Sequence, residues 1–63
     1  MKHQVFFERY YKYTFYVKDN NGNLYENDDS DAQSIYRLGI EPIMEMEEIN
    51  GEFFIDGTLF IKI

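Results

Sequence analysis

Apolar residues at every second position open the chain and predict one long, half-buried strand. The set on the odd positions, interrupted only by Arg9, is Val5, Phe7, Tyr11, Tyr13, Phe15 and Val17. A period of two is typical of a strand that lays one face on a core. The opposite face carries Phe6, Tyr10 and Tyr16, and is unusually aromatic for a face that should meet solvent. Asn21-Gly22 then predicts a turn, and residues 24–26 a returning second strand.

Between residues 30 and 38 the spacing of apolar positions becomes helical. Ser30 and Gln33 have the spacing of a capping box, which favours a helix start at Ser30. Three residues share one face of the predicted helix over 31–38, namely Ala32, Ile35 and Tyr36. Gly39 suits a left-handed C-terminal residue, and Pro42 prevents any continuation.

The last third of the chain predicts three more strands. Residues 43–49 alternate, with Met44 and Met46 on one face and two glutamates on the other. Asn50-Gly51 and Asp56-Gly57 are hairpin signals on either side of residues 52–55, and a last strand follows them. The predicted fold class is α+β: a single domain over residues 1–63, with a small antiparallel sheet of three to five strands and one short helix on one face. The predicted order is ββαβββ.

Size and composition make this domain marginal on its own. A chain of 63 residues buries only about 60% of its unfolded surface. With no Cys and one His, neither disulfides nor a His/Cys metal site can reinforce the core, which leaves oligomerisation as the available support. The N-terminal residues have no long apolar run, so we expect neither a signal peptide nor a membrane span. We therefore expect a soluble protein of the cytoplasm.

Charge is strongly polarised along the chain. Residues 19–56 hold eleven of the twelve acidic residues and a single basic one, Arg37, whereas residues 1–18 carry a net charge of +3. Nucleic-acid binders normally concentrate basic residues against phosphates, so direct nucleic-acid binding is disfavoured. The acidic segment indicates a basic partner or simply serves solubility.

Catalytic and metal-binding patterns are weak. His3 lies in a terminal segment expected to fray, and no glycine-rich phosphate loop is present, so we expect no enzyme activity. Asp19, Asn21 and Asn23 alternate like the first ligands of a calcium loop. That loop requires Gly at its sixth position and Glu at its twelfth, where this chain has Leu24 and Ser30. A hairpin turn is the better interpretation, and no metal or cofactor is expected.

The carboxylates nevertheless suggest a binding surface. Glu45 and Glu47 lie on one face of a strand, about 6.6 Å apart by the rise per residue, a spacing comparable to that of neighbouring phosphates. Four more acidic side chains surround the predicted helix start: Glu26, Asp28, Asp29 and Asp31. Together these residues could imitate a nucleic-acid backbone. They could equally form a solvated strand face and a favourable helix N-terminus.

Three stretches in order resemble a known family. FFERYYKYTFYVKDNNGNLYE, SDAQSIY and IMEMEEI are similar to the small dimeric phage-encoded inhibitors of uracil-DNA glycosylase, over roughly residues 6–49. The resemblance implies a homodimer that blocks the DNA-binding groove of a bacterial uracil-DNA glycosylase in the host cytoplasm. Acidic and polar side chains would take the place of phosphates, and a hydrophobic pocket at paired helices would capture an apolar side chain of the enzyme.

By motif position, the resemblance assigns Glu26, Asp31 and Gln33 to the basic groove. It assigns Ala32, Ile35 and Tyr36 to the pocket and the dimer contact. The chain departs from the family pattern at Ala32 and Gln33, where the family has a large aromatic residue and a Glu, and in its tail from Asn50 to Ile63. Two alternatives stay open: an acidic phage anti-defence inhibitor of another DNA-processing enzyme, such as a restriction or CRISPR nuclease, and a structural protein that assembles through Phe6, Tyr10 and Tyr16.

Overall fold

The computed structural model describes residues 1–28 and 41–63, with only the backbone at residue 28. These residues form six strands: β1 (Lys2–Tyr11), β2 (Thr14–Asp19), β3 (Leu24–Asp28), β4 (Ile43–Ile49), β5 (Glu52–Ile55) and β6 (Thr58–Lys62). The strands close into one antiparallel barrel in the order β1-β2-β3-β6-β5-β4. Among the described residues there is no helix, and therefore none long and apolar enough to cross a membrane.

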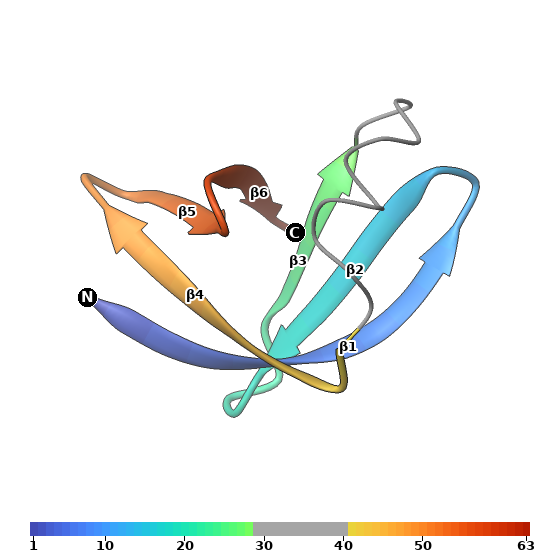
Figure 1. Ribbon diagram of the computed structural model, residues 1–63, viewed down its shortest axis with the longest axis horizontal. Helices are drawn as coiled ribbons and strands as arrows, with labels where there is room; N and C mark the ends of the chain where they lie inside the picture. Colours follow the sequence, from blue (N-terminus) through green and yellow to red (C-terminus); the bar gives the residue numbers. More distant parts are fainter. Residues whose placement is uncertain (29–40) are drawn as a thin grey trace.

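The α+β prediction is wrong, because the sheet closes on itself instead of leaving one face for a helix. Strands β1 to β3 and β4 to β6 each form a three-stranded meander, and Figure 1 shows the two meanders curving toward each other. β1 pairs with β4 from Lys2 opposite Glu47 to Phe6 opposite Ile43. β3 pairs with β6 over a shorter stretch, with Glu26 opposite Ile61. A closed barrel buries its apolar face internally. The helix predicted over 31–38 lies outside the described residues.

The predicted single first strand is in fact the β1–β2 hairpin. Lys12 and Tyr13 form its turn, with φ angles of 50° and 64°, and Tyr11 pairs with Thr14 across it. The two-residue turn pairs odd positions with even ones, as Tyr11 with Thr14, whereas beyond the bulge odd positions pair with odd ones, as Phe7 with Val17. A bulge between Phe7 and Arg9 shifts the register within β1.

The barrel interior is the hydrophobic core. Its fully or nearly fully buried members are Val5, Phe15, Val17, Tyr25, Met44, Met46, Ile55 and Phe60. Phe15 makes edge-to-face contacts with Phe7 and Phe60, at ring-centroid distances of 5.3 and 6.1 Å. In β6 the alternation places Phe60 inside and leaves Leu59 and Ile61 exposed on the outer surface.

Both C-terminal hairpin signals are confirmed. Asn50-Gly51 joins β4 to β5 with φ angles of 52° and 82°, and Asp56-Gly57 joins β5 to β6 with φ angles of 50° and 77°. Positive φ at both central residues is typical of the type I′ turn that suits the twist of paired strands.

Replacing Gly51 by Ala should lower the free energy of unfolding by about 1–2 kcal/mol, because a Cβ in the left-handed region is strained. A Cβ at this position would meet no atom within 4 Å, so the cost comes from the backbone alone. Urea unfolding measures the loss. Asn50→Gly is the matched control, since Gly adopts the same φ freely; equal losses in the two variants would contradict the turn assignment.

Candidate functional site

The outer face of β4 presents an acidic row. Met44 and Met46 point into the core, and this fixes Glu45 and Glu47 on the opposite, exposed face. The predicted strand over 43–49 and its two faces are thus confirmed. Across the neighbouring strands, Glu47 is opposite Lys2 on β1 and Phe54 on β5.

These glutamates line an open hollow of about 420 Å³, whose lining includes Ile49, Phe54 and Asp56. An adjoining hollow shares Glu45 and Asp56 and adds Glu41. We call this surface the acidic trough: Glu41, Glu45, Glu47 and Asp56 around the apolar side chains of Ile49 and Phe54. Among the described residues that line it, the one basic side chain is that of Lys2, which lies 3.5 Å from Glu45; both side chains are about two-thirds exposed. Such an exposed ion pair contributes only about 0–1 kcal/mol, so Glu45 stays available to a partner.

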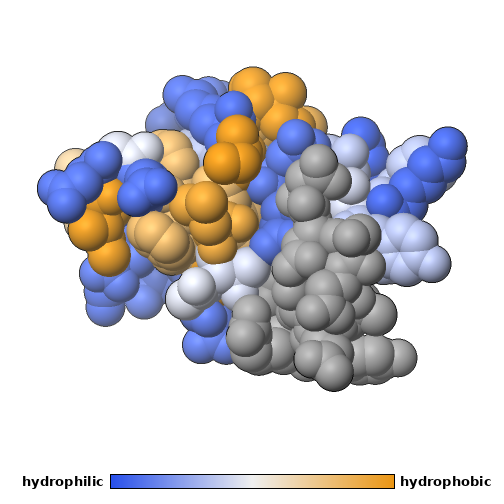
Figure 2. Space-filling view, turned by 90° about the horizontal axis from the view of Figure 1, so that it is seen from above, coloured by the Kyte–Doolittle hydropathy of each residue, from blue (hydrophilic) through white to orange (hydrophobic). Residues whose placement is uncertain are grey.

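Apolar and charged side chains alternate on the outer surface around β5 and β6. Figure 2 shows hydrophobic residues gathered beside hydrophilic ones in the half of the molecule where Figure 1 places β5 and β6. The exposed apolar residues of this region are Ile49, Leu59, Ile61 and Ile63. An apolar patch rimmed by charge is typical of a surface that binds another protein.

The structure separates the predicted site residues instead of gathering them. Glu26 is half-buried on β3, opposite Tyr16 and Ile61. In the closed barrel two strands lie between β3 and β4 in either direction, so Glu26 and the acidic trough face different sides. Asp28 ends β3, and its side chain lies outside the described part. The remaining predicted residues, Asp29, Asp31, Ala32, Gln33, Ile35 and Tyr36, lie outside the described residues.

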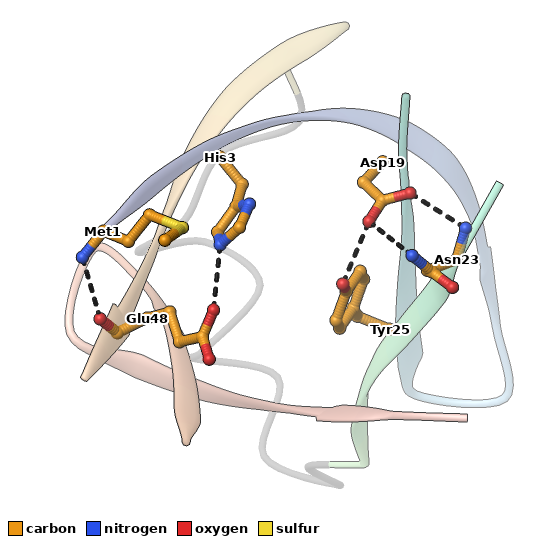
Figure 3. Close-up of polar contacts among 6 residues, drawn as sticks. All are labelled: Met1, His3, Asp19, Asn23, Tyr25 and Glu48. Carbon is orange, nitrogen blue, oxygen red and sulfur yellow. Dashed lines mark hydrogen bonds and ion pairs between the residues drawn. The ribbon is translucent and has the colours of Figure 1, made fainter. Parts of the chain in front are cut away.

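A second polar group, which the sequence analysis did not identify as a unit, occupies one mouth of the barrel. Figure 3 shows His3, Asp19, Tyr25 and Glu48 within the ring of strands. The carboxylate of Asp19 accepts four hydrogen bonds of 2.9–3.0 Å, donated by the backbone N–H groups of Asn21 and Asn23, the Asn23 side-chain amide and the Tyr25 hydroxyl. The predicted hairpin is therefore a four-residue connection organised by Asp19, with positive φ at Gly22 but not at Asn21.

Burial tends to raise the pKa of Asp19, but its hydrogen bonds outweigh that effect and lower the pKa from 3.8 to about 2. The pKa of Tyr25 rises to about 12, because of burial first and then the hydrogen bond and charge of Asp19. Among the described residues, no group of three or more His, Cys, Asp or Glu is arranged to hold a metal ion. The carboxylate of Asp19 instead fixes the β2–β3 connection.

On the other side of this mouth, His3 Nε2 lies 3.0 Å from Glu48 Oε1. The N-terminal amine donates to the Glu48 carbonyl at 3.1 Å, and the Glu48 N–H donates to the Met1 carbonyl at 2.7 Å. These contacts close the seam between β1 and β4. The His3–Glu48 pairing joins residues 45 apart in the chain, and no local pattern could have revealed it.

Comparison with known proteins gave no match to a family model, to a curated protein or to a solved structure.

Proposed function

We propose that this protein binds and blocks the DNA-binding groove of a DNA-processing enzyme, with uracil-DNA glycosylase as the particular target. The observation that carries the proposal is the exposed row of Glu45 and Glu47 on β4, extended by Glu41 and Asp56 around apolar side chains. A DNA-binding groove offers basic residues at the spacing of phosphates, and side chains about 6.6 Å apart along a strand fit that spacing.

The resemblance to the small phage inhibitors supports this choice of target, through the stretches at 6–26, 30–36 and 43–49. The contact surface we propose differs from the one that the resemblance implies. It is the outer face of β4 and β5 in place of a helix start, and the apolar side chains of Ile49 and Phe54 would receive an apolar side chain of the enzyme. This mode of action places the protein in the cytoplasm, with the enzyme.

Electrostatic steering gives the proposal a kinetic signature. Association with the enzyme should be fast at low salt and slow markedly as ionic strength rises, because salt screens charge over about 8–10 Å near physiological conditions. The lifetime of the complex should respond less, since apolar contacts hold it.

The test is uracil excision from DNA by a bacterial uracil-DNA glycosylase, titrated with this protein. Glu45→Lys or Glu47→Lys should weaken inhibition at least about tenfold, as expected for a reversed charge in a close ion-paired contact. Glu26→Lys changes the net charge equally but lies on β3, so it should change inhibition less than about threefold.

The results identify the binding surface or exclude the target enzyme. A larger loss for Glu26→Lys than for the β4 variants would favour the surface that the resemblance implies. No inhibition by excess wild-type protein would remove this target, and the same titration would then be run with restriction and CRISPR nucleases.

A further inference from the structure

The β1–β2 turn has a sequence that its backbone does not favour. In the part of the chain that the structure describes, three turns have positive φ at two successive residues, and two of them contain the favourable pairs Asn50-Gly51 and Asp56-Gly57. The third contains Lys12-Tyr13, although both residues carry a Cβ in the left-handed region. Such strain costs of order 1–3 kcal/mol per residue and is typically found where side chains have a function. The side chains of this turn therefore merit a functional explanation.

Those side chains form an exposed aromatic and basic tip. Tyr11 and Tyr13 are each 57% exposed and Tyr10 is 40% exposed. The Lys12 amine lies 5.2 Å from the centre of the Tyr11 ring, and Arg9 stacks over Tyr16 at 4.4 Å. Tyrosine and arginine are the residue types most enriched at the energetic centres of protein interfaces. We call residues 9–13 the hairpin tip.

The charge of the hairpin tip complements the acidic trough. The tip contributes Lys12 and Arg9, the latter 3.0 Å from Glu8 in an exposed ion pair, whereas the trough contributes four carboxylates around apolar side chains. The trough volume of about 420 Å³ lies within the range of clefts that hold small ligands, about 300–1,000 Å³, so one tyrosine side chain can enter. The net charge of −6 for the chain favours an acidic protein surface over a polyanionic nucleic acid as the partner of a small basic tip.

The tyrosines of the tip cannot reach the apolar side chains of the trough in their own molecule. Gln4 on β1 is paired with Glu45, and Tyr11 lies seven positions further along the strand. At about 3.3 Å per position the two residues are up to about 23 Å apart. Figure 1 accordingly places the β1–β2 turn at the opposite end of the molecule from the β4–β5 turn. Only a second copy can bring these tyrosines onto Ile49 and Phe54.

We propose that the hairpin tip of one copy docks in the acidic trough of a second copy. Tyr11 or Tyr13 lies on Ile49 and Phe54, while Arg9 and Lys12 face the carboxylates. Because each copy leaves one tip and one trough unoccupied, the contact is head-to-tail and continues from copy to copy. It differs from the two-fold dimer that the resemblance implies. Self-association does not depend on which enzyme the trough binds.

The test is sedimentation velocity of the full chain over a wide concentration range. The wild-type protein should show an average mass that rises with concentration at low salt, and an association constant at least tenfold lower in about 0.5 M NaCl. The hairpin variant Lys12→Asn/Tyr13→Gly removes both side chains yet installs a favourable type I′ turn. It should reduce the association constant at least tenfold without lowering the melting temperature.

A mixing experiment makes the test specific. The trough variant Glu45→Lys/Glu47→Lys changes exposed residues only and should also lose association at least tenfold. Mixed in equal amounts, the two variants should restore one contact, because the hairpin variant keeps its trough and the trough variant keeps its tip. The mixture should then form a one-to-one pair that does not grow further.

Three results would overturn the proposal. One is a wild-type mass that is independent of concentration into the millimolar range. Another is unchanged association in the well-folded hairpin variant. The third is a wild-type protein that stays monomeric while its hairpin tip binds a fluorescent oligothymidylate, which would assign the aromatic and basic side chains to base stacking and phosphate contact.

Discussion

Replacing Phe15 by Ala should leave a large fraction of the protein unfolded at room temperature. Phe15 has no exposed surface, and its ring meets Phe7 and Phe60 in the centre of the barrel. Truncating a buried Phe to Ala costs about 3–5 kcal/mol, from lost transfer energy and the cavity that remains. A domain of this size has a total stability of about 3–9 kcal/mol, so the loss is comparable to all of it.

Thermal unfolding followed by circular dichroism measures this effect. A variant that still folds should melt about 15 °C or more below the wild type, since each kcal/mol shifts the melting temperature of such a small domain by about 4–8 °C. Phe54→Ala is the matched control, because Phe54 is half-buried on the outer face of β5. If the two variants melted together, Phe15 would not lie at the centre of the core.

Local patterns predicted the strands of the C-terminal half well, because alternation and turn pairs depend only on residues that are close together in the chain. The alternation of Met44 and Met46 with Glu45 and Glu47 fixed both faces of β4. Asn50-Gly51 and Asp56-Gly57 placed the turns, because few other residue pairs adopt positive φ at both positions.

The closure of the barrel could not be predicted in this way. Nothing local indicates that β1 pairs with β4 as well as β2, or that Glu26 on β3 lies opposite Ile61 on β6. The first hairpin was missed because Lys12-Tyr13 is not a recognised turn pair, and the apolar alternation continues across it. Because Lys and Tyr rarely adopt positive φ, the residues at 12 and 13 do not indicate the turn that they form.

The candidate site was predicted in part. Glu45 and Glu47 were identified from their alternation, and the structure adds Asp56 and Glu41. The predicted Asn50-Gly51 turn already implies the position of Asp56, because it sets Glu47 opposite Phe54, two residues before Asp56. Glu41 precedes β4 and lies outside the alternating segment. Glu26 was grouped with Glu45 and Glu47 as an acidic residue near the predicted helix start and through the resemblance, and the closed barrel separates it from β4. The place of β3 relative to β4 depends on the pairing of β1 with β4 and of β3 with β6, which local patterns do not specify.

Replacing Asp19 by Asn should destabilise the protein by about 1–3 kcal/mol at neutral pH and flatten its stability profile in acid. Four hydrogen bonds are donated to the carboxylate of Asp19. An Asn offers one acceptor oxygen, and its NH₂ group would face donors, which leaves buried polar groups unpaired. The matched control is Asp56→Asn, an exposed turn residue at φ 50° where Asn is equally suitable.

The pH dependence follows from the lowered pKa of Asp19, about 2 in the folded protein against 3.8. A group whose folded pKa lies below its unfolded value binds more protons in the unfolded chain at intermediate pH. Its contribution is therefore complete above about pH 4 and is lost as the pH falls toward 2, by roughly 1–2 kcal/mol. Urea unfolding at pH 6, 4, 3 and 2 should show a steeper loss for the wild type than for Asp19→Asn. Parallel profiles for the two proteins would mean that the Asp19 carboxylate is not held by these four donors, and the β2–β3 connection would then need another source of order.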